Sequence, residues 1–480
     1  MLKETIKEYS GQYMQSLLSQ LHQVIPPERV LARKRDLLVY EYDSTPYTGK
    51  PTVVVLPESA EEVSHVFKIA REFDLPVVPR GAGTSLSGGP VPSLGGIVLA
   101  LSRMDKILEI DLENRRAVVQ AGVTNQNLQD VLNPLGFWFP PDPGSMSIAT
   151  IGGHVGENAG GPHCLKYGVT ANHVMGLEVV LPNGDIIETG GYVEDTPGYD
   201  LTGLLIGSEG TMGIVTRVIV RISPMPEETV TVLALLNSAW DSAEIVSEII
   251  RSGLNPSVLE MVEGRMLEEC NDLFKLEYPE SVTAQLIIEV DGEKEGIPFE
   301  LEAIMDICRK HNAQYLKIAE SAEEREKLWV ARRGTTAALG RLKPDSAEND
   351  IVVPRSQLPR LVEKLKEIGI RNGVILGVVI HAGDGNAHPQ VPFDGKNPAE
   401  ERAAHQALWE AFEAAVELGG TISGEHGIGL EKIEGMRLIF SPDELLLMRR
   451  LKLVFDPQEV LNADKMFPRD IIELAREATS

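Results

Sequence analysis

PVVPRGAGTSLSGGPVP, residues 76–92, begins as a short β-prone run and continues as a loop of small and hydroxyl side chains. Gly81 and Gly83 permit the positive-φ backbone that lets consecutive N–H groups turn toward one anion. The side chains that add hydroxyl donors or positive charge to this loop are Thr84, Ser85 and Arg80. The stretch therefore predicts an anion-binding loop directly after a strand.

A dinucleotide-binding Rossmann turn is the obvious alternative for this loop, and the sequence argues against it. Leu86 stands where that turn needs its third glycine. Pro90 and Pro92 follow where a helix would have to begin. An ordinary glycine-rich turn would suit an isolated GAG, but a second loop of the same kind follows about 70 residues later.

That second loop spans residues 148–174, IATIGGHVGENAGGPHCLKYGVTANHV. Its glycines again clear space for a close approach of the backbone, now around Asn158. They are Gly152, Gly153, Gly156, Gly160 and Gly161. A third segment, residues 206–220, is apolar and glycine-containing and reads IGSEGTMGIVTRVIV.

These three segments, in this order, resemble the FAD-binding domain of the vanillyl-alcohol-oxidase (PCMH-type) flavoprotein superfamily. Within it the match is closest to the D-2-hydroxy-acid dehydrogenase branch. That branch includes glycolate oxidase flavoprotein subunits, D-lactate dehydrogenases and D-2-hydroxyglutarate dehydrogenases. The resemblance covers residues 35–470, and it implies an α+β fold with a two-subdomain PCMH-type FAD-binding domain plus a sheet-and-helix substrate (cap) domain.

The resemblance also implies domain boundaries. It places the FAD-binding domain at residues 1–224, with a PCMH-type core at 46–224, and the cap domain at 225–420. Residues 421–480 would complete the active site and return to the FAD-binding domain. The sequence VFDPQEVLNADKMFP, residues 454–468, matches that return.

FAD contacts are implied in four parts of the chain, most of them from the backbone. The implied residues are Pro79, Arg80, Gly81, Ala82, Gly83, Thr84, Ser85, Pro143, Gly144, Ser145, Gly152, Gly153, Gly156, Asn158, Gly160, Gly161, Gly213 and Ile214. Ser85, His154 and Gly156 depart from the residues most frequent in the family. Because backbone contacts tolerate such changes, we expect little loss of FAD binding. We expect the FAD to be non-covalent, since the first loop contains no His or Cys.

The amino-acid composition argues against several classes of binding partner and cofactor. The 480 residues include 45 Lys and Arg and 71 Asp and Glu, which gives a formal net charge of −26. This negative charge argues against binding to nucleic acid or to anionic membrane surfaces. Cys164, Cys270 and Cys308 form no CxxC pair, so we expect reduced thiols in a cytoplasmic protein and no iron–sulfur cluster. No apolar run approaches the roughly 18 residues of a membrane span.

Secondary-structure patterns differ between the two halves of the chain. Residues 52–79 predict a strand, a helix with Ser59 as its N-cap, and a second strand. After residue 228, strands and helices alternate without a glycine-rich loop. The predicted strands there are 229–236, 285–290, 315–318, 350–353 and 374–380. This alternation predicts a sheet with helices on one face.

Residues 381–393, HAGDGNAHPQVPF, contain two histidines around an Asp-Gly turn. If Asp384 and Gly385 form a two-residue type I′ turn, His381 lies directly opposite His388. Directly opposed residues share a face with Cβ atoms about 5 Å apart. That spacing suits two imidazoles on one metal at about 2.1 Å each. A hydrogen-bonded core histidine remains the alternative for either residue alone.

Residues 423–429, SGEHGIG, offer the third ligand that such a site needs. The family pattern implies His381, His388 and Glu425 as ligands of a divalent metal, with Zn expected and Mn or Fe as alternatives. Two histidines and one carboxylate leave positions open for a substrate hydroxyl and carboxylate. His426 is then the natural general base. A structural neighbour of the ligand is the alternative role for His426.

The carboxylate of an acid substrate is best held by a guanidinium. Residues 328–339, LWVARRGTTAAL, contain Arg332 and Arg333, with Thr336 one helical turn after Arg332. A surface arginine pair is the alternative. The family implies that Arg332 and Thr336 lie in the substrate site.

The implied reaction is FAD- and metal-dependent oxidation of a 2-hydroxy acid to the 2-keto acid, with hydride transfer to flavin N5. The electrons would then pass to a protein or quinone-linked acceptor, such as an iron–sulfur subunit or an electron-transfer flavoprotein. Direct reduction of NAD is not expected, since the Rossmann pattern is absent. A flavin electron-relay subunit of a larger complex is the alternative from another class. A homodimer is compatible with the sequence.

Two residues bear on substrate size. In the 2-hydroxyglutarate branch a lysine helps to hold the distal carboxylate, and here the aligned residue is Glu348. Gln390 also replaces an Asn that those enzymes show two residues after the second metal histidine. The Glu348 carboxylate would repel a second substrate carboxylate. Both departures from the 2-hydroxyglutarate branch favour glycolate or D-lactate over D-2-hydroxyglutarate. If Glu348 instead points to solvent, it carries no information.

Overall fold

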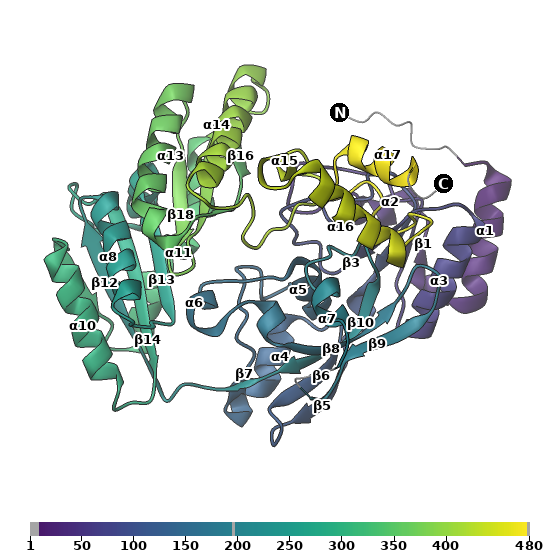
Figure 1. Cartoon of the computed structure of the whole chain (residues 1–480), viewed down its shortest axis with the longest axis horizontal. Coiled ribbons are helices and arrows are strands. Elements are labelled where there is room, and N and C mark those ends of the chain that lie inside the picture. Colours follow the sequence, from purple (N-terminus) through teal and green to yellow (C-terminus); the bar gives the residue numbers. More distant parts are fainter. Residues whose placement is uncertain (1–8, 194–196, 478–480) are drawn as a thin grey trace. The chain divides into compact units, whose positions relative to one another are not determined.

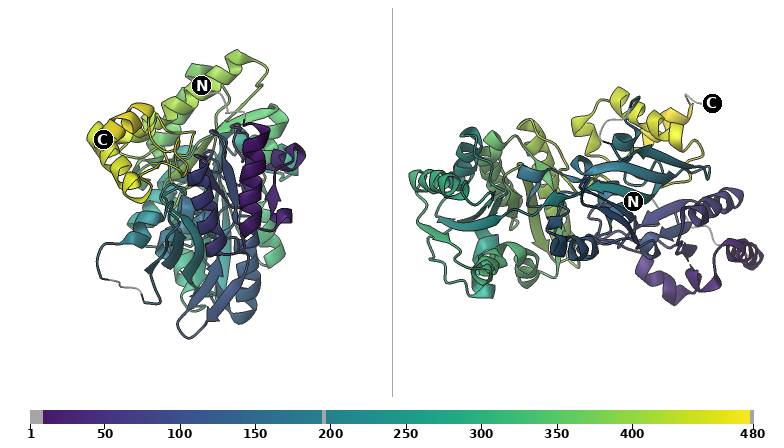
Figure 2. Two further views of the ribbon diagram at one scale, coloured as in Figure 1. Left: turned by 90° about the vertical axis from the view of Figure 1, so that its right-hand side faces the viewer. Right: turned by 90° about the horizontal axis from the view of Figure 1, so that it is seen from below.

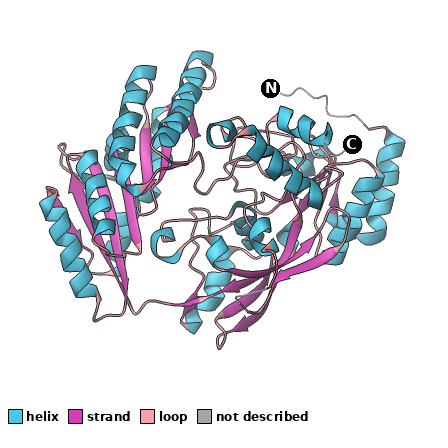
Figure 3. Cartoon of the chain, in the orientation of Figure 1, coloured by secondary structure: helices cyan, strands magenta, loops and turns pink. Residues whose placement is uncertain are grey.

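The computed structural model describes residues 9–193 and 197–477. The chain forms two compact units. Unit 1 comprises Met1–Gly160, Val169–Met225 and Glu425–Ser480, and unit 2 comprises Gly161–Gly168 and Pro226–Gly424. Each unit is built of β-sheet covered by helices (Figures 1 and 3). In the part of the chain that the structure describes, no helix is long and apolar enough to cross a membrane.

The first sheet of unit 1 carries the strand that leads into the first glycine-rich loop. Its order is β1(Val30–Leu31), β2(Val53–Val55), β4(Ile97–Ala100) and β3(Val77–Arg80). β2, β4 and β3 are parallel, and β1 is antiparallel to β2. Helix α3(Ala60–Glu72) connects β2 to β3, and its N-cap Ser59 accepts a hydrogen bond from the Glu62 N–H at 3.3 Å. The predicted strand–helix–strand unit is thereby confirmed.

Helices α1 and α3 pack side by side on this sheet (Figure 2). α1 spans Gly11–Val24. Its buried residues Leu17 and Leu21 join a core cluster with Val63 and Phe67 of α3. The apolar face of α1 therefore closes the core of this subdomain.

The second sheet of unit 1 is antiparallel and has five strands. Its order is β5(Ile107–Asp111), β6(Arg116–Gln120), β10(Ile214–Arg221), β8(Val174–Val180) and β9(Ile186–Gly190). Shorter elements of this unit are α2(Lys34–Leu37), α4(Asn125–Leu132), α5(Ile151–Glu157), α7(Leu201–Leu205), and the pair β7(Phe137–Trp138) and β11(Ser223–Pro224). The two sheets make up the two-subdomain FAD-binding architecture that the sequence predicts.

The C-terminal segment of unit 1 returns to strand β3. It contains α15(Met436–Ile439), α16(Pro442–Phe455) and α17(Arg469–Glu477). The N–H of Val77 donates to the Val460 carbonyl at 2.7 Å. The buried Lys465 ammonium donates to the carbonyls of Gly89 and Val91 at 2.5 and 2.8 Å. The C-terminal segment thus stabilises the end of the first glycine-rich loop through hydrogen bonds from Lys465.

Unit 2 is built on one antiparallel sheet. Its order is β15(Tyr315–Ile318), β12(Glu228–Leu236), β14(Ala284–Gly292), β13(Val258–Glu263), β18(Gly377–His381), β19(Asn386–Phe393) and β16(Asp345–Glu348), and β17(Ile351–Val352) also pairs with β19. Successive side chains along each strand point to opposite faces. The same sheet therefore offers one face for a core and one for a site.

Helices cover both faces of this sheet, so the expectation of helices on one face is wrong. α8(Ala239–Arg251) and α10(Ile297–Lys310) pack on β12 and β14, and α13(Leu358–Asn372) packs on α8 and on α14(Pro398–Glu417). α9(Gly264–Phe274), α11(Ala322–Arg333) and α12(Thr335–Leu342) pack together on the other face. This second helix layer was not predicted from the sequence, because α11 is mostly charged and buries only Leu328, Trp329 and Ala331.

Glu263, the last residue of β13, provides a test of this packing. By the alternation of side chains along the strand, the Glu263 side chain lies on the sheet face that α13 covers. Burial raises the pKa of its carboxyl to about 7, and the charge of Lys366 opposes this rise. Between pH 4.5 and 7 the unfolded chain binds fewer protons at the Glu263 carboxyl than the folded chain does. The contribution of Glu263 to the free energy of unfolding therefore falls as the pH rises through this range, and it stays constant above pH 7.

Glu263→Gln is therefore expected to gain stability relative to the wild type as the pH rises from 4.5 to 7, by up to about 3 kcal/mol. The measurement is urea unfolding across this pH range. Glu280→Gln, at an exposed glutamate of the same unit, is the matched control and is expected to give a flat difference. A flat difference for Glu263→Gln would contradict the pKa shift.

Candidate active site

The hairpin of β18 and β19 has a register different from the predicted one. His381 pairs with Asn386, and His388 pairs with Val379. The connection is a four-residue loop, in which the N–H of Gly385 donates to the His381 carbonyl at 3.1 Å. The predicted two-residue type I′ turn is therefore wrong. Gly385 has φ +84°, and a Cβ there would lie 2.2 Å from the Val353 carbonyl oxygen, which fixes this longer loop.

The two histidines nevertheless share a face of the sheet. The register differs from the predicted one by two residues, which is one full period of the side-chain alternation. His381 and His388 are both buried, and their ring centroids lie 5.0 Å apart at an interplanar angle of 89°. The predicted meeting of these two imidazoles is confirmed, although they are diagonal neighbours and not directly opposed.

A buried carboxylate, Glu260 of β13, links His381 to an arginine. Its Oε1 lies 2.5 Å from His381 Nδ1, and its Oε2 accepts a hydrogen bond from Arg332 Nε. Burial raises the pKa of the Glu260 carboxyl, but Arg332 and His381 outweigh this effect and leave the pKa below its ordinary value. Glu260 is therefore a carboxylate that holds two site residues, and it was not anticipated from the sequence.

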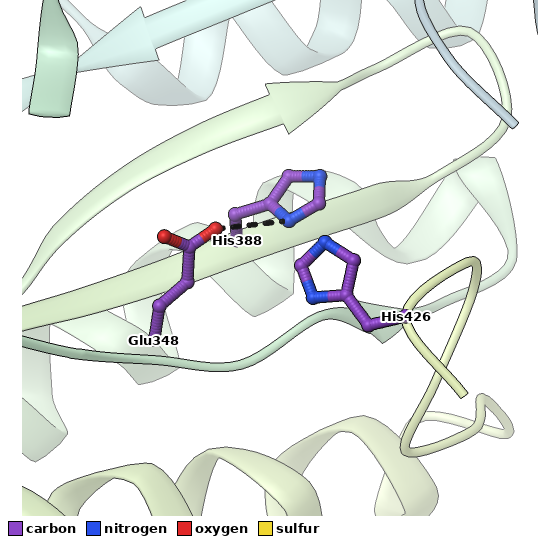
Figure 4. Close-up of side chains that lie close together, drawn as sticks. All are labelled: Glu348, His388 and His426. Carbon is purple, nitrogen blue, oxygen red and sulfur yellow. Dashed lines mark ion pairs between the residues drawn. The ribbon is translucent and has the colours of Figure 1, made fainter. Parts of the chain in front are cut away.

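Glu348 faces His388 from strand β16, as Figure 4 shows. Its Oε1 lies 3.6 Å from His388 Nδ1, and its Oε2 accepts a hydrogen bond from the Gln390 amide at 2.6 Å. The side chain of Glu348 is 31% exposed. Glu348 thus belongs to the histidine cluster, and the alternative that it simply points to solvent does not hold.

The segment before Glu425 is tied to the sheet of unit 2 by Asp350. The buried carboxylate accepts hydrogen bonds from the Gly424 N–H at 2.6 Å and from the Ser423 hydroxyl at 3.1 Å. A Cβ at Gly424 would lie 2.7 Å from a methyl group of Val352, so only glycine fits. Unit 2 ends at Gly424, and the last segment of unit 1 begins at Glu425, the next residue in the chain.

The segment after His426 is tied within unit 1 by Glu209. Its carboxylate accepts the N–H groups of Ile428 and Gly429, each at 2.6 Å. Glu209 is buried in the third glycine-containing segment and has φ +52°. The Glu-His pair is thus anchored on both sides by carboxylates that accept backbone N–H groups.

Two groups of side chains in this region have the composition of a metal site. Ligand atoms of His381, His388 and Glu425 lie within 4.8 Å of one another, and so do those of Glu348, His388 and His426. The first group consists of the three ligands that the family resemblance implies. Figure 4 shows the side chains of the second group.

Arg332 and Arg333 make different contacts, and only Arg332 contacts a residue of the candidate site. Arg333 is exposed, pairs with Glu326 and lies over the Trp329 ring at 5.4 Å, as expected of a surface arginine. Arg332 turns to Glu260 instead. Thr336 is exposed and lies in α12, because the helix breaks at Gly334, so it is not one turn further along the helix of Arg332. Its role in the site stays a prediction.

The first glycine-rich loop has the features of an anion cradle. A Cβ at Gly81 would lie 2.4 Å from Thr150 Oγ1, and Gly83 has φ +80°. None of the N–H groups of residues 81–86 donates a hydrogen bond to the residues that the structure describes. The Arg80 guanidinium lies beneath the loop and donates to the Tyr42 carbonyl at 2.8 Å. Arg80 thus supports the loop, and its contact with a ligand stays a prediction.

The second loop uses its glycines for packing. The N–H of Gly152 donates to the Ala121 carbonyl at 2.8 Å, and that of Gly153 donates to Thr150 Oγ1 at 3.2 Å. A Cβ at Gly152 would lie 2.7 Å from the Ala121 Cβ, whereas Gly156 has no neighbouring atom within 4 Å of that position. The start of α5 is therefore satisfied internally, and the open side of the loop is at Gly156.

The remaining predicted FAD residues occupy turns and strand starts. Asn158 ends α5 with φ +54°. A Cβ at Gly213 would lie 2.5 Å from Val179, which explains the glycine before β10. Gly144 has open space around its Cβ position, and Gly161 falls within unit 2. Gly144 and Gly156 thus leave open space at their Cβ positions, whereas Gly81, Gly152 and Gly213 are required by neighbouring protein atoms, and the contacts of all five with FAD stay predictions.

Two family models match the chain. Residues 51–190 match the model described as FAD binding domain, and residues 225–466 match the one described as FAD linked oxidases, C-terminal domain. The glycolate oxidase subunit GlcD of Bacillus subtilis is 44% identical over 453 residues, covering 94% of this chain and 96% of the relative. The D-lactate dehydrogenase of Archaeoglobus fulgidus is 35% identical, with 94% and 98% covered.

Solved structures agree with the fold. The p-cresol methylhydroxylase with substrate bound is 18% identical with a TM-score of 0.78, covering 94% of this chain and 96% of that one. A 4-ethylphenol oxidase from Gulosibacter chungangensis is 19% identical with a TM-score of 0.79, covering 98% and 100%. At these identities the likeness concerns the fold alone.

Gly81 tests the first loop as a cradle for FAD. Gly81→Ala puts a Cβ against Thr150 Oγ1 and is expected to weaken FAD binding tenfold or more, a loss of about 1.4 kcal/mol. FAD retention is measured by flavin absorbance after dialysis. Since the collision involves one hydroxyl, Gly81→Ala combined with Thr150→Ala should bind FAD better than the sum of the single losses predicts. Unchanged FAD binding in Gly81→Ala would contradict the cradle.

Proposed function

Because this chain belongs to the FAD-linked oxidase family, we propose that it oxidises a small D-2-hydroxy acid, glycolate or D-lactate, to the 2-keto acid. The observation that carries the proposal is the pair of buried histidines, His381 and His388, on one sheet face beside Arg332. The names of the similar glycolate oxidase subunit and D-lactate dehydrogenase support the substrate class.

The proposed residues have separate tasks. His381, His388 and Glu425 would hold a divalent ion, and Arg332 would hold the substrate carboxylate. When bound, the ion would supply Lewis acidity at the α-hydroxyl and non-covalent FAD would supply the hydride acceptor. His426 would accept the α-hydroxyl proton on a ring nitrogen. Thr336 would assist Arg332 if α12 brings its hydroxyl to the substrate.

The site favours a monocarboxylate over D-2-hydroxyglutarate. Glu348 contacts His388 and Gln390, so a second substrate carboxylate near His388 would meet an acidic side chain. Repulsion between two carboxylates grows as water is excluded. A pure electron-relay subunit, the alternative from another class, would have no use for the His381–Glu260–Arg332 arrangement.

The electrons must leave the reduced flavin by another route than NAD. We propose a protein acceptor, such as an iron–sulfur subunit or an electron-transfer flavoprotein, or a quinone-linked one. Cys164, Cys270 and Cys308 form no disulfide and no cluster-binding set among the described residues. We place the reaction in the cytoplasm, in keeping with these cysteines.

Anaerobic bleaching of the flavin by a panel of D-2-hydroxy acids tests the function and the metal together. The wild type is expected to bleach with glycolate or D-lactate and to hold about one divalent ion per chain. His388→Ala is expected to lose both the ion and the bleaching while FAD stays bound. His405→Ala, at an exposed histidine of α14, is the matched control and should behave as the wild type. Full bleaching in His388→Ala would remove the metal from the mechanism.

Substitution of Glu348 tests the substrate size. Glu348→Lys replaces the repelling charge by an attracting one and is expected to raise kcat/KM for D-2-hydroxyglutarate relative to D-lactate at least tenfold, about 1.4 kcal/mol. Glu348→Gln removes the charge alone and should give a smaller gain. The rates are measured with an artificial acceptor. A wild type that prefers D-2-hydroxyglutarate to both small acids would refute the proposed selectivity.

A further inference from the structure

We propose that Glu260 is a positioning residue that orients the metal ligand His381 and the substrate-binding Arg332 at the same time. The inference rests on the proposed function, because it takes the roles of His381 and Arg332 from there. All three residues lie in unit 2, on β13, β18 and α11.

The contact with His381 sets the chemistry of its ring. An ionised carboxylate only accepts hydrogen bonds, and Glu260 Oε1 lies 2.5 Å from His381 Nδ1. The proton of the neutral ring must therefore sit on Nδ1, which leaves the lone pair on Nε2 for a metal ion. A ligand held in this way has one tautomer and one ring orientation before the ion arrives.

The contact with Arg332 leaves the far edge of the guanidinium open. Glu260 Oε2 takes the Nε–H, and neither Nη donates a hydrogen bond to a described residue. The two Nη groups can therefore grip a carboxylate end-on. The helix that carries Arg332 is held separately, since Glu289 accepts hydrogen bonds from Arg325 and Trp329 of α11. Glu260 thus orients the arginine on a helix that is already docked.

Because Glu260 is buried, its carboxylate depends on both of its hydrogen-bond partners. Glu260 is 1% exposed, and both of its oxygens are taken by the two site residues. A buried carboxylate needs such partners, since it cannot recruit water. A merely structural ion pair would show the same burial, so the test must measure the metal and the substrate and not stability alone.

Glu260→Gln is the decisive variant. Glutamine replaces one of the two carboxylate oxygens by an NH₂ donor, so it cannot accept at both positions, one facing His381 Nδ1 and the other Arg332 Nε. The dissociation constant for Zn²⁺, measured by competition with a chelator, is expected to rise ten- to hundredfold. The KM for D-lactate is expected to rise as well, with FAD content unchanged. Glu263→Gln, on the same strand but the opposite face, is the matched control and should change neither quantity.

A second measurement examines the tautomer of His381 in the wild type itself. In metal-free protein labelled with ¹⁵N-histidine, His381 is expected to be the Nδ1–H tautomer, identified by the loss of its signals in His381→Ala. An Nε2–H tautomer, or Glu260→Gln with wild-type Zn²⁺ affinity and KM, would overturn the inference. If the wild type binds no Zn²⁺, the metal part of the proposed function fails, while the tautomer and KM still decide the role of Glu260.

Discussion

The alternation of side chains across an antiparallel strand pair is the constraint on which the candidate site depends. His381 ends β18 and His388 lies in β19, and they meet because their positions differ from direct pairing by two residues. A shift of one residue would put one imidazole on each face of the sheet. The four-residue loop with Gly385 holds the register that keeps both rings together.

Buried carboxylates then hold the surrounding pieces in place. Asp350 accepts the Gly424 N–H and Glu209 accepts two backbone N–H groups after His426, so the Glu-His pair is anchored on both sides. Glu260 acts in the same way on side chains. Each carboxylate is costly to bury alone, and its hydrogen bonds offset this cost only in one arrangement of its partners.

The site also has to bind an anion within an acidic protein. With a net charge of −26, the chain offers no general attraction for a carboxylate. Arg332 supplies positive charge locally, and Glu348 lies at the other end of the histidine cluster. Under the proposed function, this polarity would favour a substrate with one carboxylate over a substrate with two.

The β-α-β start of the FAD-binding domain, the glycine-rich loops and the shared sheet face of the two histidines could be predicted from the order of residues alone. These features follow from local rules, such as the N-cap Ser59 and the period-two alternation of strands. The hairpin register, the second helix layer and the contacts of Glu260 and Glu209 depend on packing between distant segments and are visible only in the folded chain. Glu260 and His381 are 121 residues apart, and a hydrogen bond over that separation leaves no periodic pattern in the chain.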